Sequence, residues 1–401
     1  MTALRLLTVT TLFPNQAQPT HGIFVENRLR HLLATGEVTA RVVAPVPWFP
    51  LRSSRFGAYG LYPTIPSEEI RHGVIVSHPR FLAIPRIGMS AAPFLLYAAL
   101  LGHVRRLLEE GVTFDLIDAH YFYPDGVAAL LLGRKLGKPV VITARGTDLN
   151  LVPSYRLPRR LIRWAAMEAD GVITVCQALK EVLVSFGLPP ERAVVLRNGV
   201  DLAQFTPGDR KAARRTLGFE TTRPIIASVG LLITRKGHDL IIRALADLPD
   251  VELLIAGAGP EQSALERLAI EVGVADRVHL LGSVSPARMK DVYRAADALV
   301  LASSREGWAN VLLEAMACGT PVVASAVWGT PEVVAAPAAG LLLPERSPAA
   351  IAATVRALLT TLPDRTETRR YAEQFSWDST SEGQLRLFQK IFGRIQSAVT
   401  S

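Results

Sequence analysis

The chain has little cysteine. Its 401 residues include only Cys176 and Cys318, which lie far apart. A disulfide framework needs several cysteines and a zinc site needs closely spaced ones, so the sequence excludes both classes of protein. We expect the two thiols to be small buried residues of a protein in a reducing compartment.

Long apolar segments are also lacking. Residues 1–11 form too short an apolar stretch for a signal peptide and are expected to contain a first strand. Residues 87–104 carry no Lys, Arg, Asp or Glu, but 18 residues is the lower limit for crossing a bilayer, and this stretch contains Pro93. We predict a buried or interfacial helix there and no transmembrane span.

Neither a metal nor nucleic acid is expected as a partner. No Asp-x-Asp pair follows a predicted strand, and no other group of His, Asp and Glu has the spacing of metal ligands. Aromatic residues make up 7% of the chain, and no basic stripe is interleaved with the stacking aromatics that a nucleic-acid surface uses. We therefore expect no metal and no cofactor.

Negative charge is scarce in the first half. Residues 1–205 carry 22 Lys and Arg against 15 Asp and Glu, an excess of seven, whereas residues 206–401 carry 22 against 21. A basic half favours an anionic partner, either a membrane leaflet or a phosphorylated acceptor, although basic clusters are often only solvated faces. The expected location is cytoplasmic, and peripheral contact with the inner face of a membrane stays open.

What the chain does have is an alternation of short strands and helices. Runs of Val, Ile and Leu recur between segments of helical length, which is typical of parallel sheets covered on both faces. The predicted strands are residues 4–11, 39–45, 116–119, 139–144, 171–175, 193–196, 224–229, 251–256, 278–281, 298–302 and 321–324. The predicted helices are residues 24–34, 126–136, 161–168, 178–186, 238–246, 262–271, 287–293 and 310–317.

This pattern predicts an α/β protein with two doubly wound domains, residues 1–202 and 203–377. Residues 201–222 are expected to be a linker with a short helix. Residues 46–90 are rich in Pro and Arg and poorly periodic, so we expect a functional loop or a surface excursion there.

Residues 304–325 hold the most informative pattern. Glu306 is expected in a loop, and Glu314 in the helix that follows, eight positions later. A helix start offers unpaired N–H groups to a diphosphate, and the two acids can accept hydrogen bonds from hydroxyls on either side. The spacing alone would more often mean two solvated glutamates, but the whole segment favours a clamp for a nucleotide-sugar.

This segment resembles the Glu-x7-Glu donor-site motif of retaining glycosyltransferases of family four, which have the GT-B fold. The resemblance extends from Leu7 to about Phe392 and implies two Rossmann-like domains facing a central cleft. The N-terminal domain would bind the acceptor, the C-terminal domain would bind the donor, and a last helix at 378–396 would pack back onto the first domain.

The resemblance also implies a donor site. Glu306 would bind hydroxyls of the sugar, Glu314 would bind the ribose, and amides at the start of the helix would hold the diphosphate. The residues at this helix start are Gly307, Trp308, Ala309, Asn310 and Val311.

Arg235 and Lys236 follow another predicted strand and precede a helix. Two cations at this turn can neutralise a departing diphosphate, whereas the dipole of a helix start otherwise disfavours cations. The family often has a Gly-Arg pair at this strand end. Here Gly230 is followed by Leu231, so Arg235 would supply the missing charge.

Three further contacts follow from the resemblance. Gly257 lies in a strand-to-helix turn that needs close backbone approach, and the backbone near Val284 would hold the edge of the nucleobase. Gly22, at a helix start in the first half, would contact the donor phosphate and the reacting sugar.

Arg145 departs from the family pattern, because many relatives have His at this position. A guanidinium cannot act as a general base. It suits a retaining mechanism in which the leaving phosphate accepts the proton of the acceptor. Arg145 would stabilise that phosphate or bind an anionic acceptor, or else be a structural partner of Asp148. His120, at a strand end, either positions an acceptor hydroxyl or is a satisfied buried histidine.

The expected function is metal-independent transfer of a sugar from a UDP- or GDP-sugar to a glycan or lipid-linked acceptor, with retention of configuration, in polysaccharide assembly. Glu306, Arg145 and His120 are the catalytic candidates. Two alternatives stay open, a GT-B nucleotide-sugar epimerase and a nucleotide-sugar-binding module without turnover. The arginine at position 145 argues against the epimerase.

Overall fold

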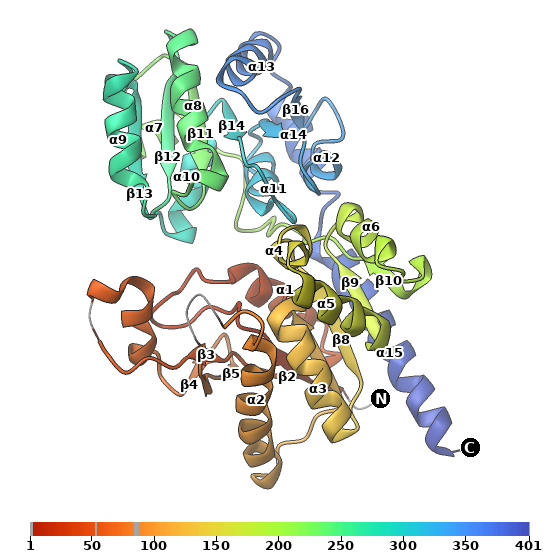
Figure 1. Ribbon diagram of the computed structural model, residues 1–401. Coiled ribbons are helices and arrows are strands. Elements are labelled where there is room, and N and C mark those ends of the chain that lie inside the picture. The colour runs from red at the N-terminus through yellow and green to blue at the C-terminus, as the bar shows by residue number, and fades with distance from the viewer. Residues whose placement is uncertain (1–2, 53, 84–87, 401) are drawn as a thin grey trace. The chain divides into compact units, whose positions relative to one another are not determined.

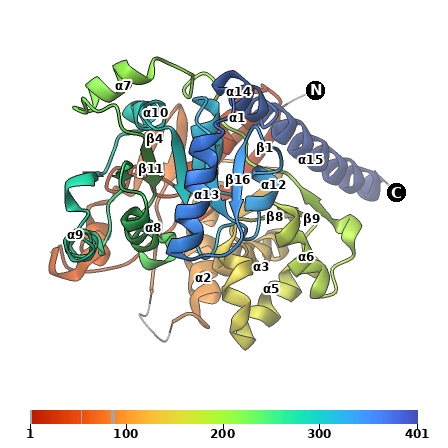
Figure 2. The same cartoon turned by 90° about the horizontal axis from the view of Figure 1, so that it is seen from above.

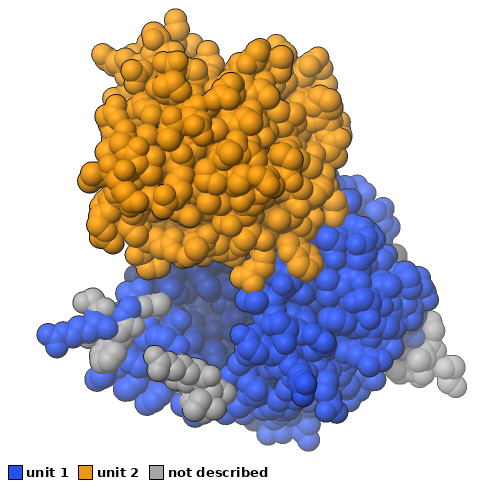
Figure 3. Space-filling view, turned by 45° about the horizontal axis from the view of Figure 1, so that its top comes forward, with its two compact units in different colours: residues 1–197, 378–401 blue, residues 198–377 orange. Residues whose placement is uncertain are grey.

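The computed structural model describes residues 3–52, 54–83 and 88–400. Strands flanked by helices recur along the whole chain (Figures 1 and 2). The chain divides into two compact units, coloured in Figure 3. Unit 1 comprises residues 1–197 and 378–401, and unit 2 comprises residues 198–377. This division falls five residues before the boundary predicted at 202, and the last helix belongs to unit 1.

Unit 1 is built on an eight-stranded sheet with the order β10-β9-β8-β7-β1-β2-β5-β4. Every neighbouring pair is parallel except β4 and β5. β7 and β8 are buried along their whole length, as their continuous apolar character predicts. The strands are β1 (Leu4–Val9), β2 (Val38–Val43), β4 (Glu68–Arg71), β5 (Val74–Ser77), β7 (Leu116–His120), β8 (Val140–Ala144), β9 (Gly171–Thr174) and β10 (Ala193–Val195).

The segment 46–90 is more regular than predicted. β4 and β5 form an antiparallel hairpin at the sheet edge, and β3 (Val46–Pro47) pairs with β6 (Arg80–Phe81). The loop prediction was therefore wrong for the hairpin, because its charged outer strand hides the apolar alternation of a strand. Residues 53 and 84–87 of this segment, including the first residue of the predicted helix 87–104, lie outside the described residues.

The helices of unit 1 cover both faces of its sheet. They are α1 (Ile23–Ala34), α2 (Ala92–Glu109), α3 (Val127–Leu136), α4 (Thr147–Asn150), α5 (Arg156–Glu168), α6 (Gln177–Ser185) and α15 (Trp377–Thr400). α2 buries Leu96, Leu100 and Val104 completely, as the predicted buried helix requires. Among the described residues, none of the helices combines the length and the apolar character that a membrane span requires.

α15 joins the core of unit 1 although it follows unit 2 in sequence. Phe388 and Ile391 pack with Leu6, Leu116 and Val141 in one buried cluster. The apolar spacing of these two residues along α15 explains why the helix returns to this sheet.

Unit 2 is built on a six-stranded parallel sheet with the order β13-β12-β11-β14-β15-β16. The strands are β11 (Ile225–Val229), β12 (Glu252–Ala256), β13 (Val278–Gly282), β14 (Ala298–Leu301), β15 (Val322–Ser325) and β16 (Gly340–Leu343). The helices are α7 (Arg210–Thr216), α8 (His238–Ala244), α9 (Gln262–Glu271), α10 (Pro286–Ala295), α11 (Asn310–Ala317), α12 (Thr330–Val333), α13 (Pro348–Thr360) and α14 (Arg365–Ala372). α8 and α13 lie next to each other (Figure 2) and share the main apolar cluster of this unit.

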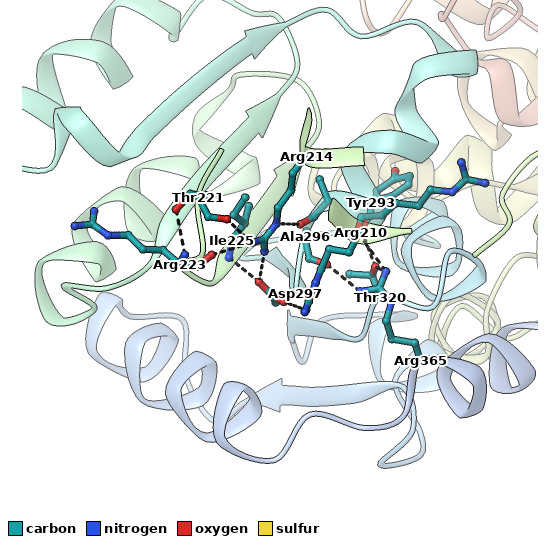
Figure 4. Close-up of polar contacts among 12 residues, drawn as sticks. Arg210, Arg214, Thr221, Arg223, Ile225, Tyr293, Ala296, Asp297, Thr320 and Arg365 are labelled. Carbon is teal, nitrogen blue, oxygen red and sulfur yellow. Dashed lines mark hydrogen bonds and ion pairs between the residues drawn. The ribbon is translucent and has the colours of Figure 1, made fainter. Parts of the chain in front are cut away.

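The short helix predicted in the linker, α7, is tied to the sheet by buried charge (Figure 4). Asp297 accepts a hydrogen bond from Nη2 of Arg214 at 2.7 Å and from the backbone N–H of Ile225 at 2.8 Å, and it also pairs with Arg210. Arg214 donates further to the carbonyl of Ala295 at 3.0 Å. The linker helix is therefore part of the structure of unit 2.

Candidate functional site

In unit 2, the loop between β11 and α8 places two cations beside a carboxylate. Lys236 Nζ lies 2.6 Å from Oε1 of Glu306, and Arg235 Nη1 lies 3.7 Å from the same oxygen. Arg235 also donates to the carbonyl of Arg305 at 2.7 Å. Because two cations face one carboxylate, this group carries a net positive charge that suits a diphosphate. The sequence predicted each of the three residues but not that they pair.

His238 holds this loop, a role that the sequence did not reveal. Its Nε2 lies 3.2 Å from the carbonyl of Leu231 and its Nδ1 lies 2.8 Å from the hydroxyl of Ser228. Burial lowers the pKa of His238 to about 4. The ring is therefore neutral at pH 7, with Nε2 as the donor and Nδ1 as the acceptor.

The start of α11 carries the predicted amide group. This helix begins at Asn310 and has no side-chain N-cap, so its first turn keeps the polarity that attracts an anion. The preceding residues are anchored on Asn198, whose carbonyl accepts from Trp308 Nε1 at 3.0 Å and whose amide donates to Oδ1 of Asn310 at 3.2 Å. The indole of Trp308 is thus engaged in the fold, and what this stretch offers a ligand is its backbone.

Glu314 lies inside α11, as predicted, and is half-buried. The hydroxyl of Tyr293, from α10, donates to Oε2 of Glu314 at 2.6 Å. Burial raises the pKa of Glu314 and the Tyr293 hydrogen bond opposes that shift. Oε1 of Glu314 has no hydrogen-bond partner within the described residues, so one carboxylate oxygen is available to a ligand hydroxyl.

Gly257 and Val284 lie in the loops that follow β12 and β13. A Cβ on Gly257 would lie 1.8 Å from the carbonyl oxygen of Gly230, so the two loops can approach only because residue 257 is glycine. Packing of the two loops is therefore sufficient to account for glycine at position 257, and no ligand need be invoked. Val284 is half-buried.

In unit 1, Gly22 caps the start of α1 with a left-handed φ of 66°. A Cβ there would lie 2.3 Å from the backbone carbon of Leu12. Close approach of the two chain segments therefore requires glycine, whether or not its N–H also meets a phosphate.

Arg145 and His120 form a buried pair at the carboxyl ends of β8 and β7. Arg145 Nη2 lies 2.6 Å from His120 Nδ1, and His120 Nε2 lies 3.1 Å from Oδ2 of Asp118. Burial lowers the pKa of His120 to about 4, and burial together with Arg28 lowers the pKa of Arg145. Since both ring nitrogens have partners in unit 1, His120 is oriented by its neighbours.

Asp148 shapes the loop that carries Arg145. Its carboxylate accepts from the backbone N–H groups of Arg145, Gly146 and Phe122 at 3.1, 2.6 and 2.8 Å. Burial raises the pKa of Asp148 and these three bonds oppose the shift. The contact between Arg145 and Asp148 that these distances describe is thus made by the backbone N–H of Arg145.

Within the described part of the chain, no three His, Cys, Asp or Glu residues are grouped as metal ligands would be. The chemistry that these residues can offer is charge and hydrogen bonding. Unit 2 offers a cationic turn, a helix start and two carboxylates, and unit 1 offers a buried guanidinium.

Comparison with known proteins identifies the family of the chain. The family described as Glycosyl transferases group 1 matches residues 209–375, and that described as Glycosyltransferase Family 4 matches residues 28–204. A D-inositol 3-phosphate glycosyltransferase of Mycolicibacterium gilvum is 34% identical over 338 residues, which are 80% of this chain and 76% of that protein. The protein of the same name from Mycobacteroides abscessus is 36% identical over 291 residues, 68% of this chain and 65% of that one.

Solved structures agree on the fold. Sucrose-phosphate synthase from Thermosynechococcus elongatus superposes with a TM-score of 0.80 at 21% identity, covering 98% of this chain and all of that one. Anabaena HepE in complex with UDP-glucose gives a TM-score of 0.71 at 21% identity, again covering 98% and 100%. Both the predicted GT-B fold and the family resemblance are confirmed: the chain is a glycosyltransferase and belongs to family four.

Proposed function

We propose that this glycosyltransferase moves a sugar from a UDP- or GDP-sugar to a glycan or lipid-linked acceptor, with retention of configuration and without a metal. The observation that carries the proposal is the arrangement around α11. Glu306 lies with Lys236 and Arg235 before the helix, and Glu314 inside it keeps one oxygen available. Anabaena HepE, whose fold is similar, binds UDP-glucose, which supports a nucleotide-sugar donor.

The donor roles follow from these contacts. Lys236, Arg235 and the uncapped start of α11 take the diphosphate, because they supply positive charge and N–H groups. The available oxygen of Glu314 accepts a hydrogen bond from a ribose hydroxyl. Glu306 binds sugar hydroxyls while it keeps Lys236 in place.

In the transfer, the bond from the anomeric carbon to the leaving phosphate breaks and the bond to the acceptor oxygen forms on the same face of the sugar. The proton of the acceptor hydroxyl passes to the leaving phosphate oxygen. Arg145 cannot take that proton, so it stabilises negative charge on the phosphate or on the acceptor. The cations carry out the charge neutralisation for which other transferases use a divalent ion.

The acceptor carries a negatively charged group in this proposal. Two buried arginines of unit 1, Arg28 and Arg145, lie near the carboxylate of Asp118, and Arg145 also lies near that of Asp148, so a buried guanidinium is held at the carboxyl end of β8. Two relatives are named for D-inositol 3-phosphate, a phosphorylated polyol. Location in the cytoplasm, at or near the inner face of a membrane, would suit a lipid-linked phosphate acceptor.

The donor part is tested with Glu314→Gln. The variant keeps the shape of the side chain but removes the charge that strengthens the ribose hydrogen bond, so donor affinity is expected to fall roughly tenfold. Thermal stabilisation by UDP- and GDP-sugars identifies the base first, and calorimetry then gives the affinity. Glu271→Gln, on an exposed position of α9, is the matched control. Unchanged donor affinity and turnover in Glu314→Gln would remove the ribose role.

The acceptor part is tested with a matched pair of compounds, D-inositol 3-phosphate and unphosphorylated inositol. We expect only phosphorylated acceptors to be glycosylated, with the α or β configuration of the donor preserved in the product and no loss of rate in EDTA. Equal rates with both compounds would contradict an anionic acceptor, and an inverted product would contradict retention.

Among the contacts of the described residues, none favours the epimerase. A binding module without turnover predicts nucleotide binding with no release of UDP or GDP in the presence of any acceptor, which the same assay measures.

A further inference from the structure

A chain of buried polar side chains connects the C-terminal helix to Arg145. Arg28 of α1 donates through Nε to Oε1 of Gln384 on α15 at 2.8 Å, and the amide of Gln384 donates to Oδ2 of Asp118 at 3.3 Å. Asp118 also lies 3.1 Å from Nε2 of His120, whose Nδ1 lies 2.6 Å from Arg145 Nη2. All five residues are at most 8% exposed.

The donors and acceptors in this chain fix its direction. A guanidinium can only donate, so Nδ1 of His120 must be the acceptor for Arg145, and Nε2 must carry the proton and donate it to Asp118. Likewise, Arg28 can only donate to the oxygen of Gln384, which turns the NH2 group of Gln384 toward Asp118. If the side-chain amide of Gln384 or the protonated nitrogen of His120 were reversed, a buried donor would face a donor and its hydrogen bond would be lost.

Gln384 is a polar residue on the buried face of α15, where packing against the sheet would be satisfied by an apolar side chain. Its neighbours along α15, such as Phe388 and Ile391, pack in the apolar cluster of unit 1, whereas Gln384 is 1% exposed and bonded at both ends of its amide. Arg28 is held in the same way by the carbonyl of Leu196, which accepts from its Nη1 at 3.0 Å.

We infer that Gln384 and Arg28 are positioning residues. They hold the carboxylate of Asp118, which in turn fixes the orientation of the His120 ring and the nitrogen that carries its proton. The His120 ring then orients the guanidinium of Arg145. The inference deepens the proposed function and rests on it only in the role of Arg145 during transfer. It assigns to the last helix of the chain, far from the donor motif in sequence, a part in ordering the acceptor side.

The test compares Gln384→Met with Phe388→Leu on the same helix. Gln384→Met keeps the length of the side chain but removes both hydrogen bonds, so we expect kcat to fall roughly tenfold. Binding of UDP or GDP to unit 2 should not change. Phe388→Leu should lower Tm but leave kcat unchanged well below the melting temperature. Gln384→Glu separates the two contacts, because it keeps the acceptor for Arg28 and loses the donor to Asp118.

The second readout is independent of turnover. Long-range 1H–15N spectra of histidine-labelled protein should show a proton on Nε2 and none on Nδ1 of His120. In Gln384→Met and Gln384→Glu the Nε2 resonance should shift and its proton should exchange faster, whereas Phe388→Leu should leave both unchanged. An Nδ1-protonated His120 in the native protein, or an unchanged Nε2 signal and kcat in both Gln384 variants, would overturn the inference.

The two proposals fail in different ways. If Arg145→Lys leaves transfer unaffected while the His120 signal still responds to Gln384, the role of Arg145 in the proposed function is wrong and the positioning chain stands. If Arg145→Lys abolishes transfer while both Gln384 variants behave like the native protein, the positioning chain is wrong and the proposed function stands.

Discussion

At the scale of single residues, the contact between Tyr293 and Glu314 determines which carboxylate oxygen is available. Tyr293 is fully buried, and its hydroxyl occupies Oε2 of Glu314. Burial next to Glu314 raises the pKa of Tyr293, so the phenol remains a hydrogen-bond donor at neutral pH. A donor that cannot ionise keeps the carboxylate in one orientation.

Tyr293→Phe is therefore expected to weaken donor binding. The hydrogen bond to a charged group is worth about 1.5–3 kcal/mol, so affinity for the nucleotide-sugar should fall by roughly tenfold or more, as measured by calorimetry. Tyr371→Phe is a matched control, because its hydroxyl donates to the carbonyl of Val333 at 3.0 Å, away from Glu314. Equal loss of donor affinity in the two variants would mean that the effect is one of general stability.

His238 gives a prediction for pH. Its pKa is about 4 in the folded protein against an ordinary value of 6.5, so the unfolded chain binds more protons between these values. The stability that neutral His238 contributes is present above pH 6.5 and is lost as pH falls toward 4, by at most roughly 3 kcal/mol. The difference in unfolding free energy between the native protein and His238→Gln should shrink over this window in urea titrations.

The unfolding free energy of His238→Gln must be subtracted from that of the native protein at each pH, because other buried groups titrate in the same pH range. Asp125 has its pKa raised to about 7 by burial, so its contribution has the opposite sign and is lost as pH rises through 7. His120 has its pKa lowered to about 4, like His238. A pH-independent difference between native protein and His238→Gln would contradict a neutral buried ring at position 238.

At the scale of elements, Asp297 joins three of them. It receives hydrogen bonds from Arg214 of α7 and from the first residue of β11, and it precedes β14 (Figure 4). On the other side of this group, Arg365 donates to the carbonyl of Ala296 at 3.1 Å and to the hydroxyl of Thr320 at 2.8 Å. Thr320 in turn donates to the carbonyl of Tyr293 at 2.7 Å, so the network reaches the helix that supports Glu314.

Asp297→Ala should destabilise unit 2 by about 3–5 kcal/mol, because it leaves a buried guanidinium without its counter-charge. Chemical denaturation measures the change. Glu373→Ala breaks the ion pair between Arg369 and an exposed carboxylate on the surface of the same unit and should cost less than about 1 kcal/mol. Similar losses in the two variants would show that the Asp297 network contributes no more than a surface pair.

At the scale of the whole molecule, α15 belongs to the unit formed by the first 197 residues although it is the last helix in the chain. Phe388 is completely buried in the cluster of unit 1, whereas Lys390 on the same helix is exposed. The stability of the sheet of unit 1 therefore depends on residues that follow unit 2 in sequence.

Phe388→Ala is expected to destabilise unit 1 by about 3–5 kcal/mol through the cavity it leaves. Hydrogen exchange should speed up in β1, β7 and β8 and remain unchanged in β11 and β12, because the lost contacts lie in unit 1. Lys390→Ala is the control and should leave both sheets unchanged. Faster exchange confined to unit 2 would contradict the assignment of α15 to unit 1.

The sequence by itself determined the sheet type, the presence of two α/β units and the loop and helix that carry Glu306 and Glu314. Near-continuous apolar runs identify buried parallel strands, and α11 begins at Asn310 and ends at Ala317 as predicted, because Gly319 and Pro321 stop a helix locally. The spacing of Glu306 and Glu314 is likewise a local property of the chain. The edge strand β4 was missed, because its sequence Glu-Glu-Ile-Arg has no apolar run.

Only the tertiary structure decided which side chains meet. Tyr293 contacts Glu314 across 21 positions, His120 contacts Arg145 across 25, and Gln384 reaches Asp118 across 266. Such contacts depend on how helices and strands pack, and a polar residue in a helix gives no sign of its partner. Local sequence thus determines the helices and strands and the chemical groups they carry. The packing of distant segments determines the orientation and the protonation of those groups.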